Sequence, residues 1–350
     1  MKLLVTGGLG FIGSTFIKHT LSQYPDTEIV NVDLNGFGAN PENLKEIKDL
    51  ENYKFVLGDV TNSYLIETLV KDVDAIVNFA AETHVDRSIA EAYKFVTTNI
   101  LGTFTLLESI RRYKDSVKYV QISTDEIYGD ILEGSFNDAS RINPSNPYSA
   151  TKASADALCL AYHRTYGLDI NITRCTNNFG PNQFPEKLIP KTTIRALRNS
   201  KIPLYGNGQN VRDWIFVGDH CEAVSLVLHK GKAGEIYNVS SGNEVSNIDL
   251  CKNILRFLGK PEDLIVFVDD RPGHDLRYSL DSSKIRSELG WKPRKSFTSA
   301  LNETITWYMN NDWWWKPLAT EMSWIQHPGW LMQTEISDHR WKRPSRLKSR

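Results

Sequence analysis

Residues 2–13 read K-L-L-V-T-G-G-L-G-F-I-G, a short apolar run followed by glycines and then by the start of a helical pattern. Gly8, Gly10 and Gly13 satisfy G-x-G-x-x-G, and Gly7 extends the glycine turn. Glycines here allow a tight turn and a close approach of the backbone to a pyrophosphate, which the free N–H groups of a helix N-terminus attract. The stretch therefore predicts a strand, a phosphate-binding turn and a helix.

The alternation of strand and helix continues to about residue 175. Short β-branched runs predict strands, and the longer stretches between them have helical spacing. The strands are expected at 2–6, 28–33, 54–58, 75–80, 119–123 and 169–174, and the helices at 11–22, 99–113 and 149–166. Such a pattern forms a parallel sheet with helices on both faces. The predicted fold class is α/β, with a Rossmann-type doubly wound parallel sheet.

Asp33 ends the second expected strand, twenty residues after Gly13. A carboxylate in that position accepts hydrogen bonds from the adenosine ribose hydroxyls, and its charge repels a 2′-phosphate. Residues 34–40 contain no arginine that would compensate, so the predicted cofactor is NAD rather than NADP. Asp59 and Val60 follow the third strand, where an adenine would lie, although an ordinary strand-end turn explains them equally well.

The regular pattern ends after residue 175, where prolines and glycines break the chain into shorter pieces. We expect residues 1–175 to form an NAD-binding Rossmann domain and residues 176–330 a smaller C-terminal lobe that mainly binds substrate. Residues 211–217 and 235–239 look like strands that could return to the main sheet. Residues 331–350 are expected to form a basic tail, with six basic and no acidic side chains over 340–350, solvated rather than a binding arm.

Composition narrows the class of protein. The 350 residues carry 41 basic and 42 acidic side chains and a net charge of −1, so no global field draws the chain to nucleic acid or an anionic membrane. The 4 cysteines are scattered, without C-x-x-C or histidines at ligand spacing, which predicts reduced thiols and no metal site. There is no signal-peptide pattern and no apolar run of about eighteen residues, so we expect a cytoplasmic location.

Tyr148 and Lys152 are four residues apart on an expected helix, so they lie on one face. This spacing arises by chance in a chain of this size. Its position is more informative, because the preceding strand should end at the carboxyl edge of the sheet, where doubly wound folds bind ligands. A nearby ammonium and a cationic nicotinamide favour phenolate, which would make Tyr148 a base for an alcohol proton. Thr124 offers a hydroxyl to hold the same oxygen.

Six stretches carry a resemblance that covers the chain from residue 1 to about residue 330. They are N-F-A-A-E-T-H-V-D-R-S (78–88), S-T-D-E-I-Y-G (123–129), Y-S-A-T-K-A-S-A-D (148–156), N-N-F-G-P-N-Q-F-P-E-K-L-I-P (177–190), R-D-W (212–214) and D-R-P-G-H (270–274). Together they resemble the dTDP-glucose 4,6-dehydratases, a family of extended short-chain dehydrogenases/reductases. The resemblance implies oxidation of dTDP-glucose at C4, loss of water across C5 and C6, and return of hydride to C6 from a tightly bound NAD that is regenerated in each turnover.

In the resembled family, two adjacent carboxyl residues after the threonine act as acid and base. This implies that Asp125 donates a proton to the departing C6 oxygen and that Glu126 accepts the C5 proton. Asp125 would have to stay protonated, through burial or the neighbouring charge of Glu126. By itself, T-D-E at a strand end is more often a solvated turn or a helix cap. Sugar-nucleotide epimerases usually carry small or uncharged residues here, so the pair separates dehydration from epimerisation.

The glycine turn, Asp33 and the resemblance together give two sets of binding residues. Contact with NAD is expected at Gly7, Gly10, Phe11, Ile12, Gly13, Asp33, Asp59, Val60, Phe79, Ala80, Ala81, Thr83, Thr98, Tyr148, Lys152 and Asn178. Contact with the sugar nucleotide is implied for Thr83, Thr124, Asn177, Lys187, Leu188, Pro203, Leu204, Tyr205, Arg212, Asn247, Asp270, Arg271 and His274. Arg212 and Arg271 match the family's diphosphate-binding positions, which suits the bidentate guanidinium. His84 and Arg87 lie in a family motif without an assigned chemistry.

Three other interpretations stay open. A 4-epimerase, or another dehydratase for a UDP- or GDP-sugar, would use the same scaffold but give no 4-keto-6-deoxy product from dTDP-glucose. A dinucleotide-sensing regulator would have no need of an intact Thr124, Tyr148 and Lys152 set. A nucleic acid or membrane partner would depend on the basic tail. The resembled family commonly forms homodimers through the two helices expected at 99–113 and 149–166.

Overall fold

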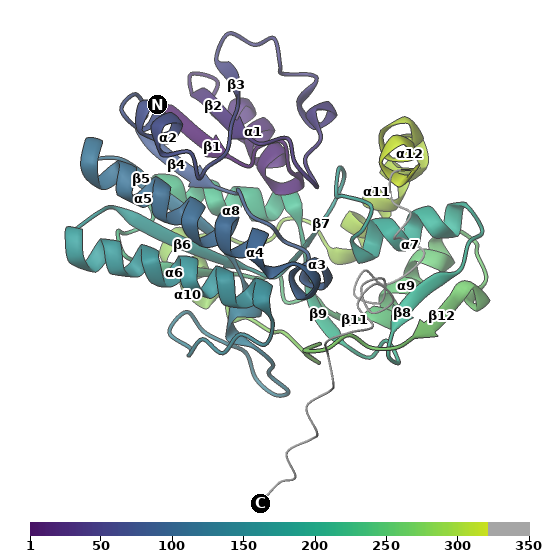
Figure 1. The fold of residues 1–350 in the computed structure, drawn as a ribbon. Helices are drawn as coiled ribbons and strands as arrows, with labels where there is room; N and C mark the ends of the chain where they lie inside the picture. Colours follow the sequence, from purple (N-terminus) through teal and green to yellow (C-terminus); the bar gives the residue numbers. More distant parts are fainter. Residues whose placement is uncertain (321–350) are drawn as a thin grey trace, which may run out of the picture.

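Seven strands form one parallel sheet in the order β10-β6-β5-β4-β1-β2-β3 (Figure 1). They are β1 (Lys2–Thr6), β2 (Glu28–Asp33), β3 (Tyr53–Leu57), β4 (Ala75–Asn78), β5 (Lys118–Thr124), β6 (Ile170–Cys175) and β10 (Ile236–Val239). The computed structural model describes residues 1–320, so the expected basic tail, 331–350, lies outside the described residues. Strand order runs outward in both directions from β1 and β4, which confirms the predicted doubly wound fold.

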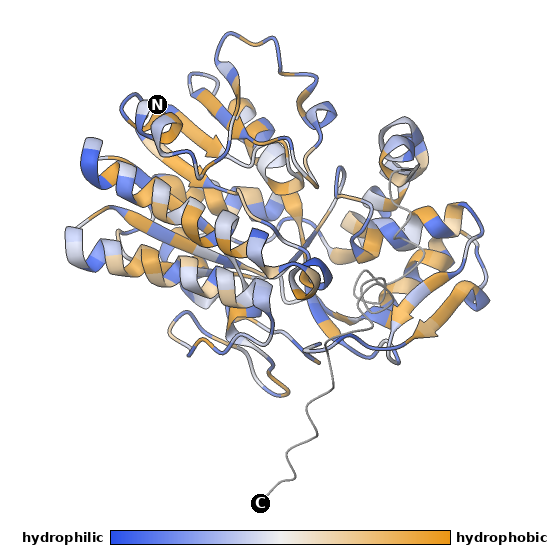
Figure 2. Ribbon diagram, in the orientation of Figure 1, coloured by the Kyte–Doolittle hydropathy of each residue, from blue (hydrophilic) through white to orange (hydrophobic). Residues whose placement is uncertain are grey.

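Helices cover both faces of this sheet. α2 (Ser63–Val70), α5 (Gly102–Tyr113) and α6 (Pro147–Tyr166) pack on one face, and α1 (Phe11–Gln23), α8 (Val217–Lys230) and α10 (Ser283–Leu289) on the other. In β1, Leu3 and Val5 belong to the apolar cluster beneath α1 and α8, whereas Leu4 belongs to the one beneath α5 and α6. Successive strand side chains point to opposite faces, so the hydrophobic strands visible in Figure 2 need cover on both sides.

A smaller group of elements lies beside the main sheet, on the right of Figure 1. β7 (Asn177–Phe179), β9 (Val211–Phe216) and β11 (Glu244–Ser246) form one sheet, and β8 (Ile202–Tyr205) pairs with β12 (Ile265–Val268). The helices of this group are α7 (Leu188–Leu197), α9 (Asn247–Phe257), α11 (Phe297–Asn310) and α12 (Asp312–Thr320). Of the two segments that could have returned to the main sheet, 235–239 does so as β10, whereas 211–217 pairs with β7 and β11 as β9.

Short helical turns connect these elements. They are η1 (Pro41–Leu44), α3 (Val85–Ala90), α4 (Ala92–Phe95), η2 (Val96–Leu101), η3 (Asp125–Tyr128) and η4 (Glu262–Leu264). No helix among residues 1–320 is long and apolar enough to cross a bilayer. The 4 cysteines are buried and free.

The helix expected at 99–113 begins differently from the prediction, with the π-helical turn η2 ahead of α5. The Asn99 side chain in this turn accepts a hydrogen bond from Glu82 N at 2.8 Å and donates one to Thr151 Oγ1 at 2.9 Å. π turns often occur at functional sites because they change the register of a helix face. Here the turn directs Thr98 to the cavity described below. Periodicity did not reveal it, because the turn depends on the partners of Asn99.

Arg174 of β6 connects three elements that carry the site. Its side chain is buried, and its Nε donates to Asp156 Oδ2 of α6 at 3.0 Å. Its Nη1 donates to the Tyr128 hydroxyl of η3 at 2.7 Å, and this hydroxyl donates to Asn238 Oδ1 of β10 at 2.9 Å. The guanidinium thus fixes α6 and η3 against β6 and the edge strand β10.

We expect Asp156→Asn to lower the free energy of unfolding by about 3–5 kcal/mol, because it leaves the buried Arg174 guanidinium without its counter-charge. Denaturant titration measures this change. The double variant Asp156→Leu/Arg174→Met removes both charges and should be less destabilised than the single variant. If both variants lose the same stability, packing rather than the uncompensated charge is responsible.

Candidate active site

A cavity of about 330 Å³ lies where β1 to β6 end, since the parallel sheet brings these carboxyl ends to one edge. All residues expected to contact NAD line it, as do the expected catalytic residues. From the sequence-based sets, the lining contains Gly7, Gly10, Phe11, Ile12, Gly13, Asp33, Asp59, Val60, Phe79, Ala80, Ala81, Thr83, Thr98, Thr124, Asp125, Glu126, Tyr148, Lys152, Asn177, Asn178 and Lys187. Across residues 1–320, no group of three His, Cys, Asp or Glu side chains is placed to hold a metal ion.

The glycine turn shapes one end of this cavity. Gly7 has φ +69°, and a Cβ there would lie 2.6 Å from Ala80 N, so only glycine fits between β1 and the segment after β4. Gly10 is the N-cap of α1 and provides no side-chain cap. The N–H groups of the first turn of α1 are therefore available to an anionic ligand.

Asp33 closes the same end of the cavity at the last position of β2. Its carboxylate is buried and accepts hydrogen bonds from Leu9 N at 2.9 Å and Asn35 N at 2.8 Å. Burial raises the pKa of Asp33, and these two backbone hydrogen bonds oppose the rise. The arrangement of a glycine turn, an uncapped helix start and a fixed carboxylate fits the pyrophosphate and ribose of a dinucleotide.

The other end of the cavity contains the two adjacent carboxyl groups. Thr124 ends β5 and caps η3: its Oγ1 accepts a hydrogen bond from Glu126 N at 3.3 Å and donates one to Asp125 Oδ1 at 3.1 Å. Asp125 is buried and Glu126 is half-buried, and each carboxyl group has one enclosed oxygen without a hydrogen-bond partner among the described residues. Buried polar atoms of this kind are rare and commonly mark sites that meet a ligand.

The two carboxyl groups differ in their electrostatic surroundings. Burial, and then the charge of Glu126, raise the pKa of Asp125 well above its usual value. Burial also raises the pKa of Glu126, but the charges of Arg271, Arg212 and Lys187 oppose that rise. The protein therefore favours a protonated Asp125 beside a Glu126 whose negative charge has cationic neighbours.

Tyr148 and Lys152 reach the cavity from the first turns of α6. The helix starts at Pro147 behind a capping box between Asn146 and Ser149, which fixes where its first turn lies. Lys152 Nζ donates to Ile122 O at 2.5 Å, and burial lowers the pKa of Lys152. Burial, and then the charge of Glu126, raise the pKa of Tyr148 well above its usual value, so the protein's own groups favour the neutral phenol. That Lys152 favours phenolate stays a prediction.

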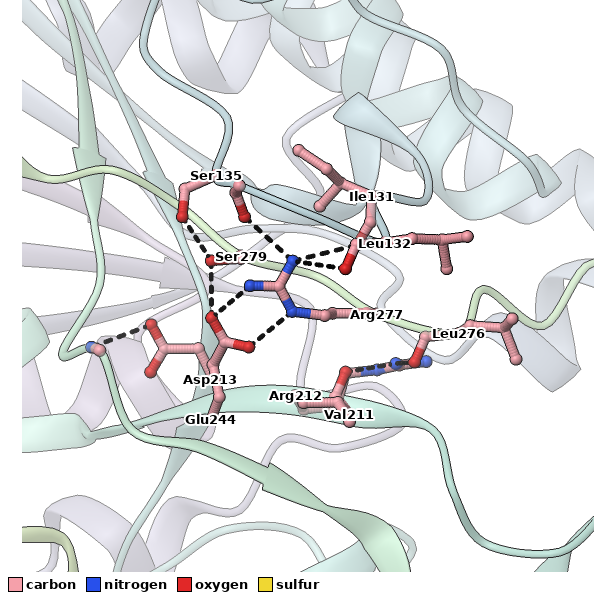
Figure 3. Close-up of polar contacts among 12 residues, drawn as sticks. Ile131, Leu132, Ser135, Val211, Arg212, Asp213, Glu244, Leu276, Arg277 and Ser279 are labelled. Atoms are coloured by element: carbon pink, nitrogen blue, oxygen red, sulfur yellow. Dashed lines mark hydrogen bonds and ion pairs between the residues drawn. The ribbon is translucent and has the colours of Figure 1, made fainter.

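The remaining residues expected to bind the sugar nucleotide lie outside the lining of this cavity. They are Leu188, Pro203, Leu204, Tyr205, Arg212, Asn247, Asp270, Arg271 and His274. Arg212 and Arg271 nevertheless lie close enough to Glu126 for their charges to act on it. Arg212 donates to Val211 O at 2.7 Å and to Leu276 O at 3.3 Å (Figure 3). It also donates to Asp275 O at 2.9 Å.

Figure 3 also shows how the smaller group of elements is joined to residues 131–135, which follow η3 in the sequence. Arg277 binds both oxygens of Glu244 on β11, with N–O distances of 2.6 and 2.8 Å. The same guanidinium donates to Gly134 O at 2.9 Å, and Ser135 shares a hydrogen bond with Ser279 at 2.7 Å. This network fixes the chain that follows Asp125 and Glu126.

Part of the cavity lining lies outside the residues predicted from the sequence. Phe37 and Phe184 line it with ring centroids 4.9 Å apart, and the Arg87 guanidinium lies 3.7 Å from the centre of the Phe37 ring. Phe37 lies between Gly36 and Gly38 directly after β2, a position where loops of this fold bind ligands. That position was the available signal, but periodicity says nothing about side chains that meet from two loops and helix α3.

Comparison with known proteins identifies the family of this chain. A family model described as GDP-mannose 4,6 dehydratase matches residues 4–304. A curated dTDP-glucose 4,6-dehydratase from Streptomyces niveus is 49% identical over 333 residues, which cover 94% of this chain and 99% of that protein.

Two solved structures illustrate the range of similarity. A dTDP-glucose 4,6-dehydratase from Streptomyces venezuelae, crystallised with NAD and dTDP, has a TM-score of 0.89 and 47% identity, covering 91% of this chain and 100% of that chain. A UDP-glucose 4-epimerase from Thermotoga maritima with UDP-glucose has a TM-score of 0.82 but only 28% identity, covering 89% and 99%.

Burial of Asp125 should reduce stability as the pH rises. Its folded-state pKa is raised, so above the ordinary carboxyl pKa of about 4 the unfolded chain releases the proton while the folded protein keeps it, which favours unfolding until the folded pKa is reached. We expect Asp125→Asn, which cannot ionise, to be more stable than the wild type at pH 8, by on the order of 1 kcal/mol. Thermal melts from pH 5 to pH 8 should show the gain increasing with pH. A constant or decreasing difference would contradict the raised pKa.

Proposed function

Because this chain belongs to the GDP-mannose 4,6 dehydratase family and, within it, to the dTDP-glucose 4,6-dehydratases, we propose that it converts dTDP-glucose to dTDP-4-keto-6-deoxy-glucose. The observation that carries this function is the Asp125 and Glu126 pair in one cavity with Tyr148. A 4-epimerase needs no acid and base for loss of water, and the UDP-glucose 4-epimerase above is more distant in sequence than the dehydratases.

NAD is the cofactor of this reaction. When bound, it would supply a hydride acceptor for the oxidation of C4 and a hydride donor for the reduction of C6. The glycine turn offers backbone N–H groups to the pyrophosphate, and Asp33 offers its carboxylate to the adenosine ribose. Glu82, Gln183 and Phe184 border the cavity as well, so the site surrounds a ligand from several loops.

In the first step, we assign Tyr148 as the base that takes the proton of the C4 hydroxyl. Thr124 lies beside it in the cavity and holds the same oxygen through its hydroxyl. Since burial favours the neutral phenol, Tyr148 requires positive charge from Lys152 and from an oxidised nicotinamide to act as a base. The proton transfer accompanies oxidation of C4 to a ketone.

In the second step, we assign Glu126 as the base for the C5 proton, which the C4 ketone has made acidic. Asp125 gives its proton to the C6 oxygen, which departs as water. A C5=C6 double bond conjugated to the ketone forms in the sugar. The raised pKa of Asp125 supports the role of acid. The pKa of Glu126 is also raised, which makes it a stronger base once ionised, and the charges of Arg271, Arg212 and Lys187 limit that rise. Hydride addition at C6 and return of a proton to C5 complete the product.

We propose residues 1–175 as the NAD-binding domain and the smaller lobe within 176–330 as the main nucleotide-binding part. Arg212 and Arg271 support this division, since both lie near Glu126 but belong to the smaller lobe. A diphosphate bound between these two arginines would direct the attached sugar toward Asp125 and Glu126. Lys187 lines the cavity on the same side.

We also propose that the chain forms a homodimer and acts in the cytoplasm. α5 and α6 lie side by side on one face of the sheet (Figure 1). Their outer surface carries exposed Phe104 and Tyr166, with Leu101 exposed just before α5 and the small side chain of Ala150 exposed near the start of α6. This surface supports pairing of two copies through these helices.

Purified protein should convert dTDP-glucose over many turnovers without added NAD, because the cofactor is regenerated in each cycle. Mass spectrometry follows the loss of water, and absorbance at the nicotinamide band follows the cofactor. UDP-glucose and GDP-mannose serve as matched controls for the nucleotide and sugar. Stoichiometric accumulation of NADH with the wild type, or epimerised sugar without loss of water, would exclude the proposed cycle.

The assigned roles predict that two variants stop at different steps. Glu126→Gln should still oxidise C4, giving a burst of reduced nicotinamide, and then lose water on the order of 10²–10⁴-fold more slowly. Tyr148→Phe should slow the first oxidation and give no burst. Single-turnover absorbance measures both. An equal and complete loss of the oxidation step in the two variants would contradict the assignment.

A further inference from the structure

The short helix α3 connects the two ends of the site. The segment directly before it, residues 79–83, lines the cavity. Ser88 Oγ accepts a hydrogen bond from Tyr148 N at 3.2 Å, and Val85 packs against the Tyr148 side chain. Asp86 extends from the same helix to the smaller lobe. One turn of helix thus contacts both Tyr148 and the proposed nucleotide-binding part.

Asp86 has no role in the proposed reaction, yet its carboxylate is buried and fully engaged. Its Oδ1 accepts a hydrogen bond from Arg271 Nη1 at 2.9 Å, and its Oδ2 accepts one from the Tyr205 hydroxyl at 2.7 Å. Burial alone raises the pKa of Asp86, but the charges of His84 and Arg271 and the two hydrogen bonds lower it to about 2. Burial also lowers the pKa of His84, so at neutral pH Arg271 supplies the counter-charge.

Arg271 uses only part of its guanidinium in this contact. Its Nε is buried and has no hydrogen-bond partner among the described residues. A buried donor without an acceptor is costly, and an anionic oxygen satisfies it best. Nε belongs to the side of the guanidinium that binds phosphate in bidentate geometry, whereas Asp86 occupies Nη1 on the opposite side.

We propose that Asp86 is a positioning residue for substrate binding, because it holds Arg271 at Nη1 and leaves the Nε side for the diphosphate of the sugar nucleotide. This inference rests on the proposed function. Arg side chains have many rotamers, and fixing one before the ligand arrives removes that entropy cost from binding. Because α3 also contacts Tyr148, the same helix fixes the distance between the diphosphate site and the residue that meets the C4 oxygen.

Asp86→Ala should weaken binding of dTDP to the NAD-loaded protein by about tenfold, measured by titration calorimetry. Asp86→Asn keeps the acceptor oxygen without the charge and should fall between Ala and the wild type. In steady-state turnover of dTDP-glucose, KM should rise by a similar factor while kcat changes much less. Thymidine, which has no phosphate, should bind all three proteins alike.

Glu222→Gln is the matched control. It weakens the carboxylate–guanidinium pair with Arg294, which belongs neither to the cavity lining nor to the contacts of Arg212 and Arg271, so the affinity for dTDP should not change. NAD content and melting temperature establish that each Asp86 variant is folded.

A double-mutant cycle separates positioning from a general structural role. In an Arg271→Gln background, Asp86→Ala should cause almost no further loss of dTDP affinity. The inference is overturned if Asp86→Ala binds dTDP as well as or better than the wild type, or if the same loss persists without Arg271. If the wild type itself neither binds dTDP nor converts dTDP-glucose, the proposed function fails instead.

Discussion

The geometry of the site depends on the interactions of the buried Arg174 guanidinium. The guanidinium binds Asp156 of the helix that carries Tyr148 and Lys152, and Tyr128 of the turn that carries Asp125 and Glu126. A charge buried this deeply is stable only with such partners. Moving α6 would leave the ion without its counter-charge, and moving η3 would remove one of its hydrogen bonds. The Tyr148–Lys152 pair, to which we assign oxidation, and the Asp125–Glu126 pair, to which we assign loss of water, are thereby held in a fixed arrangement.

The pKa values of the adjacent Asp125 and Glu126 carboxyl groups are shifted by different neighbouring charges. Burial raises the pKa of both groups. The charge of Glu126 raises that of Asp125 further, whereas the charges of Arg271, Arg212 and Lys187, all from the smaller lobe, oppose the rise for Glu126. Neither lobe alone would produce this difference. A buried carboxyl group with a raised pKa is typical of active sites, where ionisable groups are retained for their chemistry.

Much of the fold follows from local pattern. β-branched runs and helical spacing gave the six N-terminal strands of the sheet to within a few residues, and the glycine turn with Asp33 located one end of the cavity. The errors lie where distant contacts override the pattern. The π turn before α5 depends on Asn99 bonding to Glu82 and Thr151, and 211–217 pairs with β7 and β11 rather than with the main sheet.

The sequence by itself determined the fold class, the cofactor type and the residues at the ends of the parallel strands, because these depend on periodicity and on short motifs. Tertiary structure alone decided which of those residues are protonated and which distant side chains meet. Asp86 and Arg271 are 185 residues apart along the chain and 2.9 Å apart in space. Burial and through-space charge set the pKa of Asp125 and the orientation of Arg271, and neither is encoded in the spacing of neighbouring residues.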